Sequence, residues 1–435
     1  MFSKPKRIVF ATIGSLGDLH PCLALGQELQ SRGHSVTIAA TKVYRDKVED
    51  LGMSFCAMRP NWEPTDQELI RQCEVLRTGP EVLFRKLILP YLPATYRDLL
   101  SACAGIDLLI AGELVYAAPL VAERLQLRWI SMILSPSSFF SSHDPSVLVT
   151  IPGLMRLRKL GRPIYWAGLQ AGRIASWHWS NPVRNLRRQL GLRRNCDPVF
   201  RDKFSRNLVL ALFSPEMAHA QPDWPEQTLQ PGFVFHDNER SDVDASRELA
   251  QFLAKGDAPL VFTLGSTAAH HPGNFYEASV AAARELNCRA VLIGSKETGH
   301  ISPDIFALPY VPYSKIFPSA SVVVHQGGSG TTGQALRAGH PMLVIPYGWD
   351  QPDNGARMER LGLGLALARD SYSSRTAIAA IRRLLTDPSF AARTKEVGWK
   401  VRNENGLSKS GDAIESILSH ADEGSQVSWA GFTGK

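Results

Sequence analysis

The chain has 435 residues, of which 44% are hydrophobic and 20% charged, and its formal net charge is +7. A chain of this length is expected to form two domains of roughly 200 residues each. The composition is that of a folded globular protein and excludes a wholly disordered one, and no run approaches the ~18 apolar residues that a membrane-spanning helix needs.

The first segment, MFSKPKRIVFATIGSLGD, has an apolar run that breaks at Gly14 without a small-residue cleavage site. This pattern predicts a buried strand rather than a signal peptide. The six cysteines are scattered, with no CxxC pair and no histidine at metal-ligand spacing. Free thiols in a reducing compartment are therefore expected, which favours a cytoplasmic protein without a cysteine-bound metal.

The first third of the chain alternates strand-like and helix-like segments. We predict strands at 7–14, 35–40, 107–112 and 128–135, and helices at 19–33 and 117–125. Strands that are apolar throughout are typical of a parallel sheet covered by helices on both faces.

The excess of positive charge lies in one segment. Thirteen Lys or Arg stand against two acids between Arg156 and Arg206, so this stretch carries +11 and the rest of the chain −4. Tyr165, Trp166, Trp177 and Trp179 are interleaved with the arginines at roughly helical spacing. Three interpretations stay open: a solvated basic face with its aromatics packed inward, a surface that contacts anionic lipid or gathers an apolar ligand, and nucleic-acid binding. The last is the least favoured, because no recognised nucleic-acid module surrounds the segment.

A second alternation of strands and helices follows a polar, Pro-rich stretch and predicts a second domain. We predict a first domain at 1–231 with a helical insertion at about 151–206, a linker at 232–246, a second domain at 247–405, a helix at 406–420 that crosses back to the first domain, and a tail at 421–435. The fold class is therefore α/β, with two doubly wound domains, whose ligands bind beyond the carboxyl ends of the strands.

The stretch VVVHQGGSGTTGQALRAG ends a predicted strand at His325 and starts a helix after a glycine-rich turn. Gly328 and Gly330 let backbone N–H groups approach an anion, and the helix dipole favours negative charge there. With Ser329, Thr331 and the imidazole of His325, this segment is expected to neutralise a diphosphate without a divalent metal.

A further strand, MLVIP, leads to Asp350 and Gln351. One is an acceptor-only side chain and the other both donates and accepts, a combination suited to the adjacent hydroxyls of a sugar. The glycine cluster alone is weak evidence of a diphosphate site, because it could be a plain turn between a strand and a helix. The order of H-x-G-G-x-G-T, then G-x-P, then D-Q along the chain is a much more specific indication of such a site.

From Tyr310 to Gly364 the sequence resembles the nucleotide-sugar signature of inverting glycosyltransferases of family 1, which have the GT-B fold of two facing Rossmann-like domains with an interdomain cleft. The resemblance covers nearly the whole chain. It extends to bacterial antibiotic and sterol glycosyltransferases, and the stretches GSLGDLHP, SPSSFFSSHDP, QPDWP and LVFTLGST are most similar to the rhamnosyltransferases of rhamnolipid synthesis and their bacterial relatives.

The resemblance implies roles for particular residues. Tyr310 and Val311 would hold the base, and Asp350 and Gln351 the sugar. The residues implied for the diphosphate are Thr267, His325, Ser329, Gly330 and Thr331. The implied co-substrate is a nucleotide sugar of the dTDP-rhamnose or UDP-glucose type, with no other cofactor and no metal. Plant members place a Glu where Gly333 stands here, and a nucleotide without a ribose 2′-hydroxyl would not fully need that carboxylate.

The first domain is expected to supply a base from the other side of the interdomain cleft. Inverting transfer is a single displacement in which the acceptor hydroxyl loses a proton. Family members carry a His or an Asp after the glycine of the first turn, which implies Asp18 here, with His20 as the alternative base or a substrate contact. The simpler alternative is that Asp18 only caps the helix from Leu19.

The acceptor is expected to be an apolar small molecule or lipid, because the insertions of the first domain are rich in Phe, Tyr, Leu and Pro. Peripheral attachment at the inner face of a membrane through the Arg-rich segment is a further hypothesis, and no nucleic-acid partner is expected. A nucleotide-sugar epimerase of the same fold and a non-catalytic lipid-binding protein remain as alternatives, while a nicotinamide dehydrogenase is disfavoured by GSLGD, which lacks the third glycine of GxGxxG.

Overall fold

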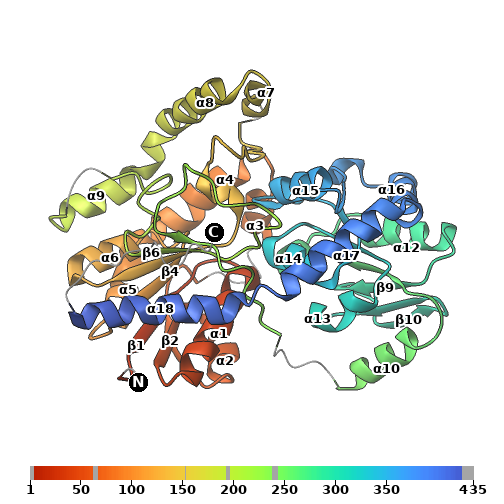
Figure 1. Cartoon of the computed structure of the whole chain (residues 1–435), viewed down its shortest axis with the longest axis horizontal. Coiled ribbons are helices and arrows are strands. Elements are labelled where there is room, and N and C mark those ends of the chain that lie inside the picture. Colours follow the sequence, from red (N-terminus) through yellow and green to blue (C-terminus); the bar gives the residue numbers. More distant parts are fainter. Residues whose placement is uncertain (1–3, 62–66, 152, 193–195, 238–242, 424–435) are drawn as a thin grey trace. The chain divides into compact units, whose positions relative to one another are not determined.

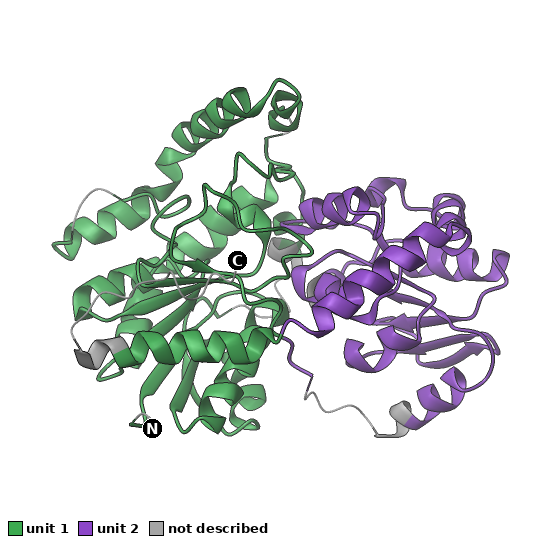
Figure 2. Cartoon of the chain, viewed as in Figure 1, with its two compact units in different colours: residues 1–234, 405–435 green, residues 235–404 purple. Residues whose placement is uncertain are grey.

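The computed structural model describes residues 4–61, 67–151, 153–192, 196–237 and 243–423 (Figure 1). The chain forms two compact units (Figure 2): unit 1 is Met1–Val234 with Asn405–Lys435, and unit 2 is Phe235–Glu404. Within the described residues, no helix has both the length and the hydropathy to cross a bilayer.

Two of the predicted segment boundaries need correction. The predicted linker, 232–246, contains the start of helix α10 (Val243–Leu253), whose Leu249 and Phe252 are buried. The predicted tail, 421–435, likewise begins inside helix α18 (Gly406–Glu423), and the rest of it lies outside the described residues.

Unit 1 is built on a seven-stranded parallel sheet with the order β3-β2-β1-β4-β5-β6-β7. Its strands are β1 (Arg7–Ala11), β2 (Ser35–Ala40), β3 (Ser54–Ala57), β4 (Leu108–Gly112), β5 (Trp129–Ile133), β6 (Leu208–Ala211) and β7 (Thr228–Leu229). The central strands are buried along nearly their whole length, as expected for a sheet with helices on both faces.

Unit 1 has ten α-helices among its described residues. They are α1 (Leu16–Ser31), α2 (Arg45–Glu49), α3 (Gln67–Cys73), α4 (Gly79–Val82), α5 (Leu92–Ala102), α6 (Ala118–Leu125), α7 (Leu154–Arg158), α8 (Arg162–Ala175), α9 (Asn181–Gln189) and α18. Helix α1 begins three residues before its predicted start at 19, because the Ser15 side chain accepts from the Gly17 N–H and caps it.

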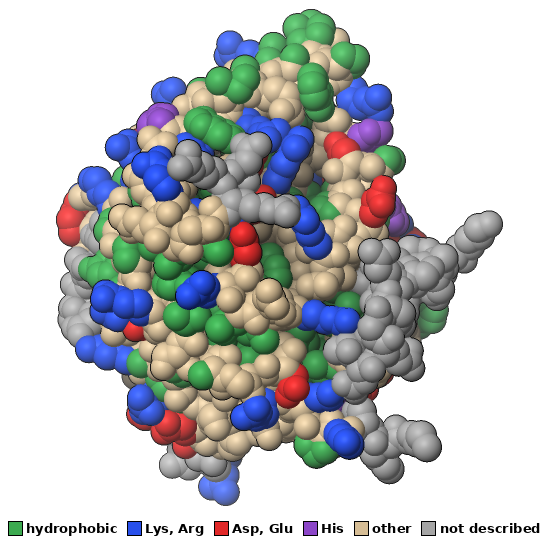
Figure 3. All heavy atoms as spheres, turned by 90° about the vertical axis from the view of Figure 1, so that its left-hand side faces the viewer, with side chains coloured by type: hydrophobic (Ala, Val, Ile, Leu, Met, Phe, Trp, Pro, Cys, Tyr) green, Lys and Arg blue, Asp and Glu red, His purple; other side chains and the backbone are tan. Residues whose placement is uncertain are grey.

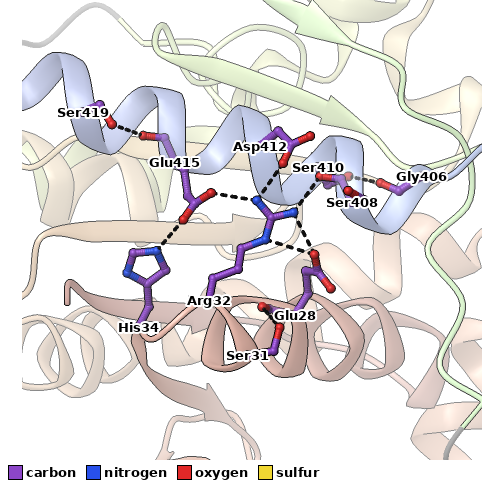
Figure 4. A network of polar contacts seen from close by, with 10 residues as sticks. All are labelled: Glu28, Ser31, Arg32, His34, Gly406, Ser408, Ser410, Asp412, Glu415 and Ser419. Carbon is purple, nitrogen blue, oxygen red and sulfur yellow. Dashed lines mark hydrogen bonds and ion pairs between the residues drawn. The ribbon is translucent and has the colours of Figure 1, made fainter. Parts of the chain in front are cut away.

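Helix α18 returns to unit 1 and packs on α1. Its apolar residues Ala413, Ile414, Ile417 and Leu418 join the core that α1 forms against the sheet. The guanidinium of Arg32, the C-cap of α1, lies 2.7 Å from carboxylate oxygens of Asp412, Glu415 and Glu28 (Figure 4). His34 Nε2 lies 3.1 Å from the other Glu415 oxygen, so α18 is held by apolar packing and by an ionic network.

The Arg-rich insertion is helical in large part, and α7, α8 and α9 occupy about half of it. Tyr165 is buried and Trp179 is partly buried beside Phe84. Trp166 and Trp177 are instead exposed, so the expectation that the aromatics pack inward is wrong for these two.

Unit 2 has a second seven-stranded sheet with the order β10-β11-β9-β8-β12-β13-β14, parallel except for the β10–β11 pair. Its strands are β8 (Leu260–Thr263), β9 (Ala290–Ile293), β10 (Gly299–Ser302), β11 (Ile305–Leu308), β12 (Val322–His325), β13 (Met342–Val344) and β14 (Gly364–Ala366). Both units are therefore Rossmann-like.

The α-helices of unit 2 alternate with the strands except where β9, β10 and β11 follow one another directly. They are α10, α11 (Gly265–Ala268), α12 (Phe275–Glu285), α13 (Tyr313–Ile316), α14 (Ser329–Ala338), α15 (Gln351–Arg360), α16 (Ser374–Thr386) and α17 (Pro388–Arg402). Helices α12 and α16 contribute to one apolar core against the sheet, while α14 and α17 pack together. The carboxyl ends of the strands thus lead into α11, α14 and α15, where the candidate residues lie.

Candidate active site

Three adjacent strands of unit 2 bring most of the predicted donor residues to one edge of the sheet. Strand β12 lies between β8 and β13, with His325 opposite Val344 and Val324 opposite Phe262. Because these strands are parallel and in register, their carboxyl ends meet at the same edge. The turns after them begin α11, α14 and α15.

The turn between β12 and α14 depends on glycine. Gly327 has φ +90°, and a Cβ there would lie 2.5 Å from Val344 Cγ1. Gly328 is the N-cap of α14 and has no side chain to bond the first turn. The first N–H bonded into the helix is that of Thr332, 2.8 Å from the Gly328 oxygen. The N–H groups of Ser329, Gly330 and Thr331 lack intrahelical acceptors and form a ready anion site.

His325 contributes a neutral imidazole to this turn. Its ring is fully buried, and burial lowers its pKa to about 3, so the imidazole carries no charge near pH 7. A neutral imidazole can act on a diphosphate only through a hydrogen bond. The Gly327 N–H donates to Nδ1 at 3.0 Å, which places the ring proton on Nε2.

Ser329 and Asp350 are bonded to each other. The Ser329 hydroxyl donates to Asp350 Oδ2 at 2.7 Å, and Asn354 Nδ2 donates to the same oxygen at 2.8 Å. The structure therefore brings the predicted diphosphate residue and the predicted sugar residue together at the start of α15. Asn354, one helical turn after Asp350, was not among the predicted residues, although its spacing of four residues puts it on the same helix face.

Gln351 is buried and turned toward its own backbone. Its Oε1 accepts from the N–H groups of Tyr347 at 2.7 Å and Gly348 at 3.1 Å. If Gln351 contacts sugar hydroxyls, it would therefore do so mainly by donating from its amide N–H₂ group. Gln351 also orders the turn that precedes Asp350.

Thr331 is buried in the first turn of α14, and Gln326 Nε2 lies 3.4 Å from its hydroxyl oxygen. Gln326 was not predicted either. It fills the space beside the glycine turns, where a Cβ at Gly265 would lie 2.4 Å from its Nε2. Only the spatial neighbourhood of β8 and β12 reveals this residue.

The other predicted donor residues are more loosely placed. Tyr310 and Val311 follow β11, the first 43% exposed and the second buried. Exposure leaves the Tyr310 ring open to stacking. Thr267 lies in the short helix α11 after β8, and its side chain lies outside the described residues.

Several buried polar atoms around these turns have no hydrogen-bond partner among the described residues. They are His325 Nε2, Gln326 Oε1, Thr332 Oγ1, Trp349 Nε1 and Asn354 Oδ1. Since buried polar groups are normally satisfied, a cluster of unsatisfied ones beside an uncapped helix favours a polar ligand or ordered water at this edge. Among all residues that the structure describes, no three His, Cys, Asp or Glu side chains lie close enough together to hold a metal ion.

In unit 1, Asp18 is the third residue of α1 and closes a capping box with Ser15. Its Oδ2 accepts from the Ser15 N–H at 2.8 Å. Gly14, with φ +147°, makes room for it, because a Cβ there would lie 2.1 Å from Asp18 Oδ2. The N-cap itself is Ser15 rather than Asp18. The carboxylate therefore has a structural role in addition to any chemical one.

His20 lies two residues further along α1 and is partly buried. Side chains two apart on a helix point to different sides, so Asp18 and His20 do not converge on one point from α1. Tyr44 lies beside the same turn: its hydroxyl donates to the Gly14 oxygen at 3.2 Å, and burial together with the Asp18 charge raises its pKa. The two candidate bases are thus distinct alternatives rather than a pair.

Two family models match the chain. The glycosyltransferase family 28 N-terminal domain matches residues 8–136, and the C-terminal domain of erythromycin biosynthesis protein CIII-like proteins matches residues 288–410. The first match includes β1, α1 and Asp18. The second contains every predicted donor residue except Thr267.

Individual relatives agree with these matches. O-mycaminosyltylonolide 6-deoxyallosyltransferase of Streptomyces fradiae is 32% identical over 427 residues, which are 94% of this chain and 97% of that protein. Sterol 3-beta-glucosyltransferase of Candida albicans is 27% identical over 444 residues, and the match covers 95% of this chain but only 28% of that enzyme. The chain therefore corresponds to part of the sterol enzyme and to nearly all of the bacterial one.

Among solved structures, the glycosyltransferase VinC in complex with dTDP matches with a TM-score of 0.67 and 19% identity, covering 95% of this chain and 100% of that one. At this level of identity the likeness establishes the fold alone. It places both Rossmann-like sheets in the GT-B architecture.

Proposed function

This chain belongs to the GT-B glycosyltransferases that join a family 28 N-terminal domain to an EryCIII-like C-terminal domain, and on that premise we propose that it moves a hexose from a nucleoside diphosphate sugar to a hydroxyl of an apolar acceptor, with inversion. The observation that carries the proposal is the uncapped start of α14 after the Gly327 turn. Its free N–H groups suit a diphosphate, which a nucleotide sugar provides and loses in the reaction.

Unit 2 is proposed to hold the donor. The N–H groups of Ser329, Gly330 and Thr331 and the neutral Nε2–H of His325 would bind the phosphates by hydrogen bonds. Tyr310 would stack on the base. The bound dTDP of VinC supports a nucleoside diphosphate of this kind, and either dTDP-rhamnose or UDP-glucose fits the same set of groups.

Asp350 and the amide of Gln351 are proposed to bind the sugar. Asp350 Oδ2 already accepts two hydrogen bonds, so a sugar hydroxyl would take the remaining acceptor capacity of this carboxylate. Ser329 is tied to that carboxylate, which couples the position of the sugar residue to that of the phosphate residue.

Asp18 of unit 1 is proposed as the general base. As the acceptor oxygen bonds to the anomeric carbon, the bond to the diphosphate oxygen breaks and the hydroxyl proton passes to the base. The donor diphosphate leaves as the anion that α14 binds. His20 is the second candidate for the same step.

Charge on the leaving group is proposed to be neutralised by the α14 dipole and its N–H groups rather than by a divalent cation. Turnover is then expected to persist unchanged in excess EDTA. A loss restored by Mg²⁺ or Mn²⁺ would contradict this part of the proposal.

The acceptor is proposed to be a hydrophobic alcohol of polyketide, sterol or lipid type. The names of the relatives support this class, since one acts on a tylonolide and others on sterols. The family membership favours transfer over the epimerase and lipid-binding alternatives.

A donor screen tests the proposed function. UDP-glucose and dTDP-rhamnose are incubated separately with the protein and a panel of hydrophobic alcohols, and products are identified by mass spectrometry. Transfer predicts nucleoside diphosphate in a one-to-one ratio with a β- or α-glycoside inverted relative to the donor. Free nucleotide without glycoside, or a glycoside of retained configuration, would refute the proposal.

A further inference from the structure

Helix α8 exposes an apolar face to solvent. The residues on its outward side are Pro163, Ile164, Trp166, Ala167, Ala171, Ile174 and Ala175, and all are exposed. Ile174 is 75% exposed and Trp166 55%. Leu160 before the helix and Trp177 after it extend the same apolar surface. Contiguous exposed apolar side chains of this size mark an interaction surface rather than ordinary solvent-facing residues.

The opposite side of α8 is already occupied. Tyr165 and Leu169 pack with Leu154 of α7 in a small cluster of their own. Gly168 permits this close approach, since a Cβ there would lie 2.7 Å from a Leu157 methyl carbon. The packing of α8 on α7 therefore does not involve the apolar residues of the outward face.

Positive charge borders the apolar face. Arg156, Arg158, Lys159 and Arg162 are exposed at the α7–α8 turn, and no Asp or Glu occurs from residue 145 to 196. Among the described residues, Arg156, Arg158 and Lys159 pair with no carboxylate. Figure 3 shows hydrophobic side chains beside Lys and Arg at the top of its view, where α7 and α8 lie in Figure 1.

We propose that the outward face of α8 and the α7–α8 turn dock on an anionic lipid bilayer. The apolar side chains would enter the boundary between headgroups and acyl chains, with the cations beside the lipid phosphates. Trp166 and Trp177 are of the type that prefers this boundary. A second copy of the chain fits less well, because a twofold contact would bring the same cations against each other. The inference goes beyond the proposed transfer reaction and does not depend on it.

Vesicle sedimentation of the full chain tests the apolar part. The wild type should bind vesicles of equal parts phosphatidylglycerol and phosphatidylcholine. Trp166→Glu and Ile174→Glu should each lower the partition coefficient at least tenfold, because a charge replaces an inserted side chain. Trp399→Glu on α17 is the matched control, since Trp399 is 64% exposed in unit 2 and should have no effect.

The electrostatic part needs a second pair of variants. Arg158→Glu with Lys159→Glu should weaken binding by more than about fivefold per position, whereas Arg375→Glu with Arg382→Glu, exposed on α16, should not. Pure phosphatidylcholine should bind the wild type far more weakly. The proposal is overturned if all variants bind like the wild type, or if the wild type ignores vesicles and instead sediments as an oligomer that Ile174→Glu dissociates. Thermal unfolding of each variant verifies the fold.

Discussion

Asp18 combines a helix-capping role with the proposed chemical one, and the two can be separated by substitution. Asn at position 18 can still accept from the Ser15 N–H but cannot take a proton from the acceptor. Asp18→Asn is therefore expected to reduce turnover by about 10²–10⁴-fold while the nucleoside diphosphate still binds, as measured by initial rates and calorimetry.

Ser15→Ala provides the control, because it removes the N-cap hydroxyl but leaves the carboxylate in place. It should cost about 1 kcal/mol of stability and little activity. Nearly normal turnover in Asp18→Asn would move the base to His20, and a loss in Ser15→Ala as large as in Asp18→Asn would reduce Asp18 to a structural residue.

Burial of His325 predicts a particular dependence of stability on pH. The folded pKa is about 3 against 6.5 for an ordinary histidine, so the unfolded chain binds the extra proton below pH 6.5. Folding is therefore destabilised as the pH falls. The free energy of unfolding is unaffected by His325 above about pH 6.5 and decreases by about 1.4 kcal/mol per pH unit as the pH falls toward 3.

His325→Gln removes this linkage. Urea unfolding at pH 7 and pH 5 should show a smaller drop in the free energy of unfolding for the variant than for the wild type, whatever the variant's stability at pH 7. Parallel changes in the two proteins would show that His325 is not buried as a neutral ring.

At the scale of the element, the start of α14 can be probed by adding one methyl group. A Cβ on Gly330 would meet no protein atom within 4 Å, and Gly→Ala inside a helix stabilises by roughly 0.4–1 kcal/mol. If a diphosphate rests on this turn, the new methyl group should obstruct it. Gly330→Ala should therefore bind nucleoside diphosphate at least tenfold more weakly, by calorimetry, while being at least as stable as the wild type.

Gly327→Ala is the contrasting variant. Its positive φ and the 2.5 Å approach to Val344 predict a loss of stability as well as of binding. Unchanged affinity in Gly330→Ala would place the phosphates away from α14.

The elements show what sequence reasoning can reach. Strand β2 was predicted with its bounds, because a short run rich in β-branched and small apolar residues lies between two turns. Strands β3 and β10 were missed: each lies at an edge of its sheet, is four residues long and is not fully buried, so no apolar run marks it.

The candidate site divides in the same way. His325, the last residue of β12, and Asp350, at the start of the helix after β13, could be found because parallel strands deliver their carboxyl ends to one edge. Gln326 escaped notice because its contacts come from the Gly265 turn after another strand. The charge state of His325 depends on how completely other segments bury it, and spacing along the chain contains no such information.

At the scale of the whole molecule, charge and apolar surface are concentrated on one part of unit 1. Eight of the thirteen Lys and Arg between Arg156 and Arg206 lie between the start of α7 and the end of α9, where no Asp or Glu occurs, while the chain outside 156–206 carries −4. The sequence located the charge correctly but not the exposure of Trp166, because the periodicity of α8 is apolar on both sides and does not say which side the protein covers.

The chain leaves unit 1 after Val234 and returns to it at Asn405, so the stability of the first unit depends on its last helix. Ile414 of α18 is fully buried in the core shared with α1. Ile414→Ala should cost about 2–5 kcal/mol. Hydrogen exchange should then show protection lost in β1 and α1, with β12 and α14 of unit 2 unchanged.

Asp412→Ala, on the exposed side of the same helix, removes only one of the carboxylates around Arg32 and should cost less than about 1 kcal/mol. The contrast between the two variants separates apolar packing from the ionic network as the force that holds α18. If Ile414→Ala instead lowered protection in unit 2 alone, α18 would stabilise the second unit. That result would contradict the contacts that α18 makes with α1 through Ile414 and Arg32.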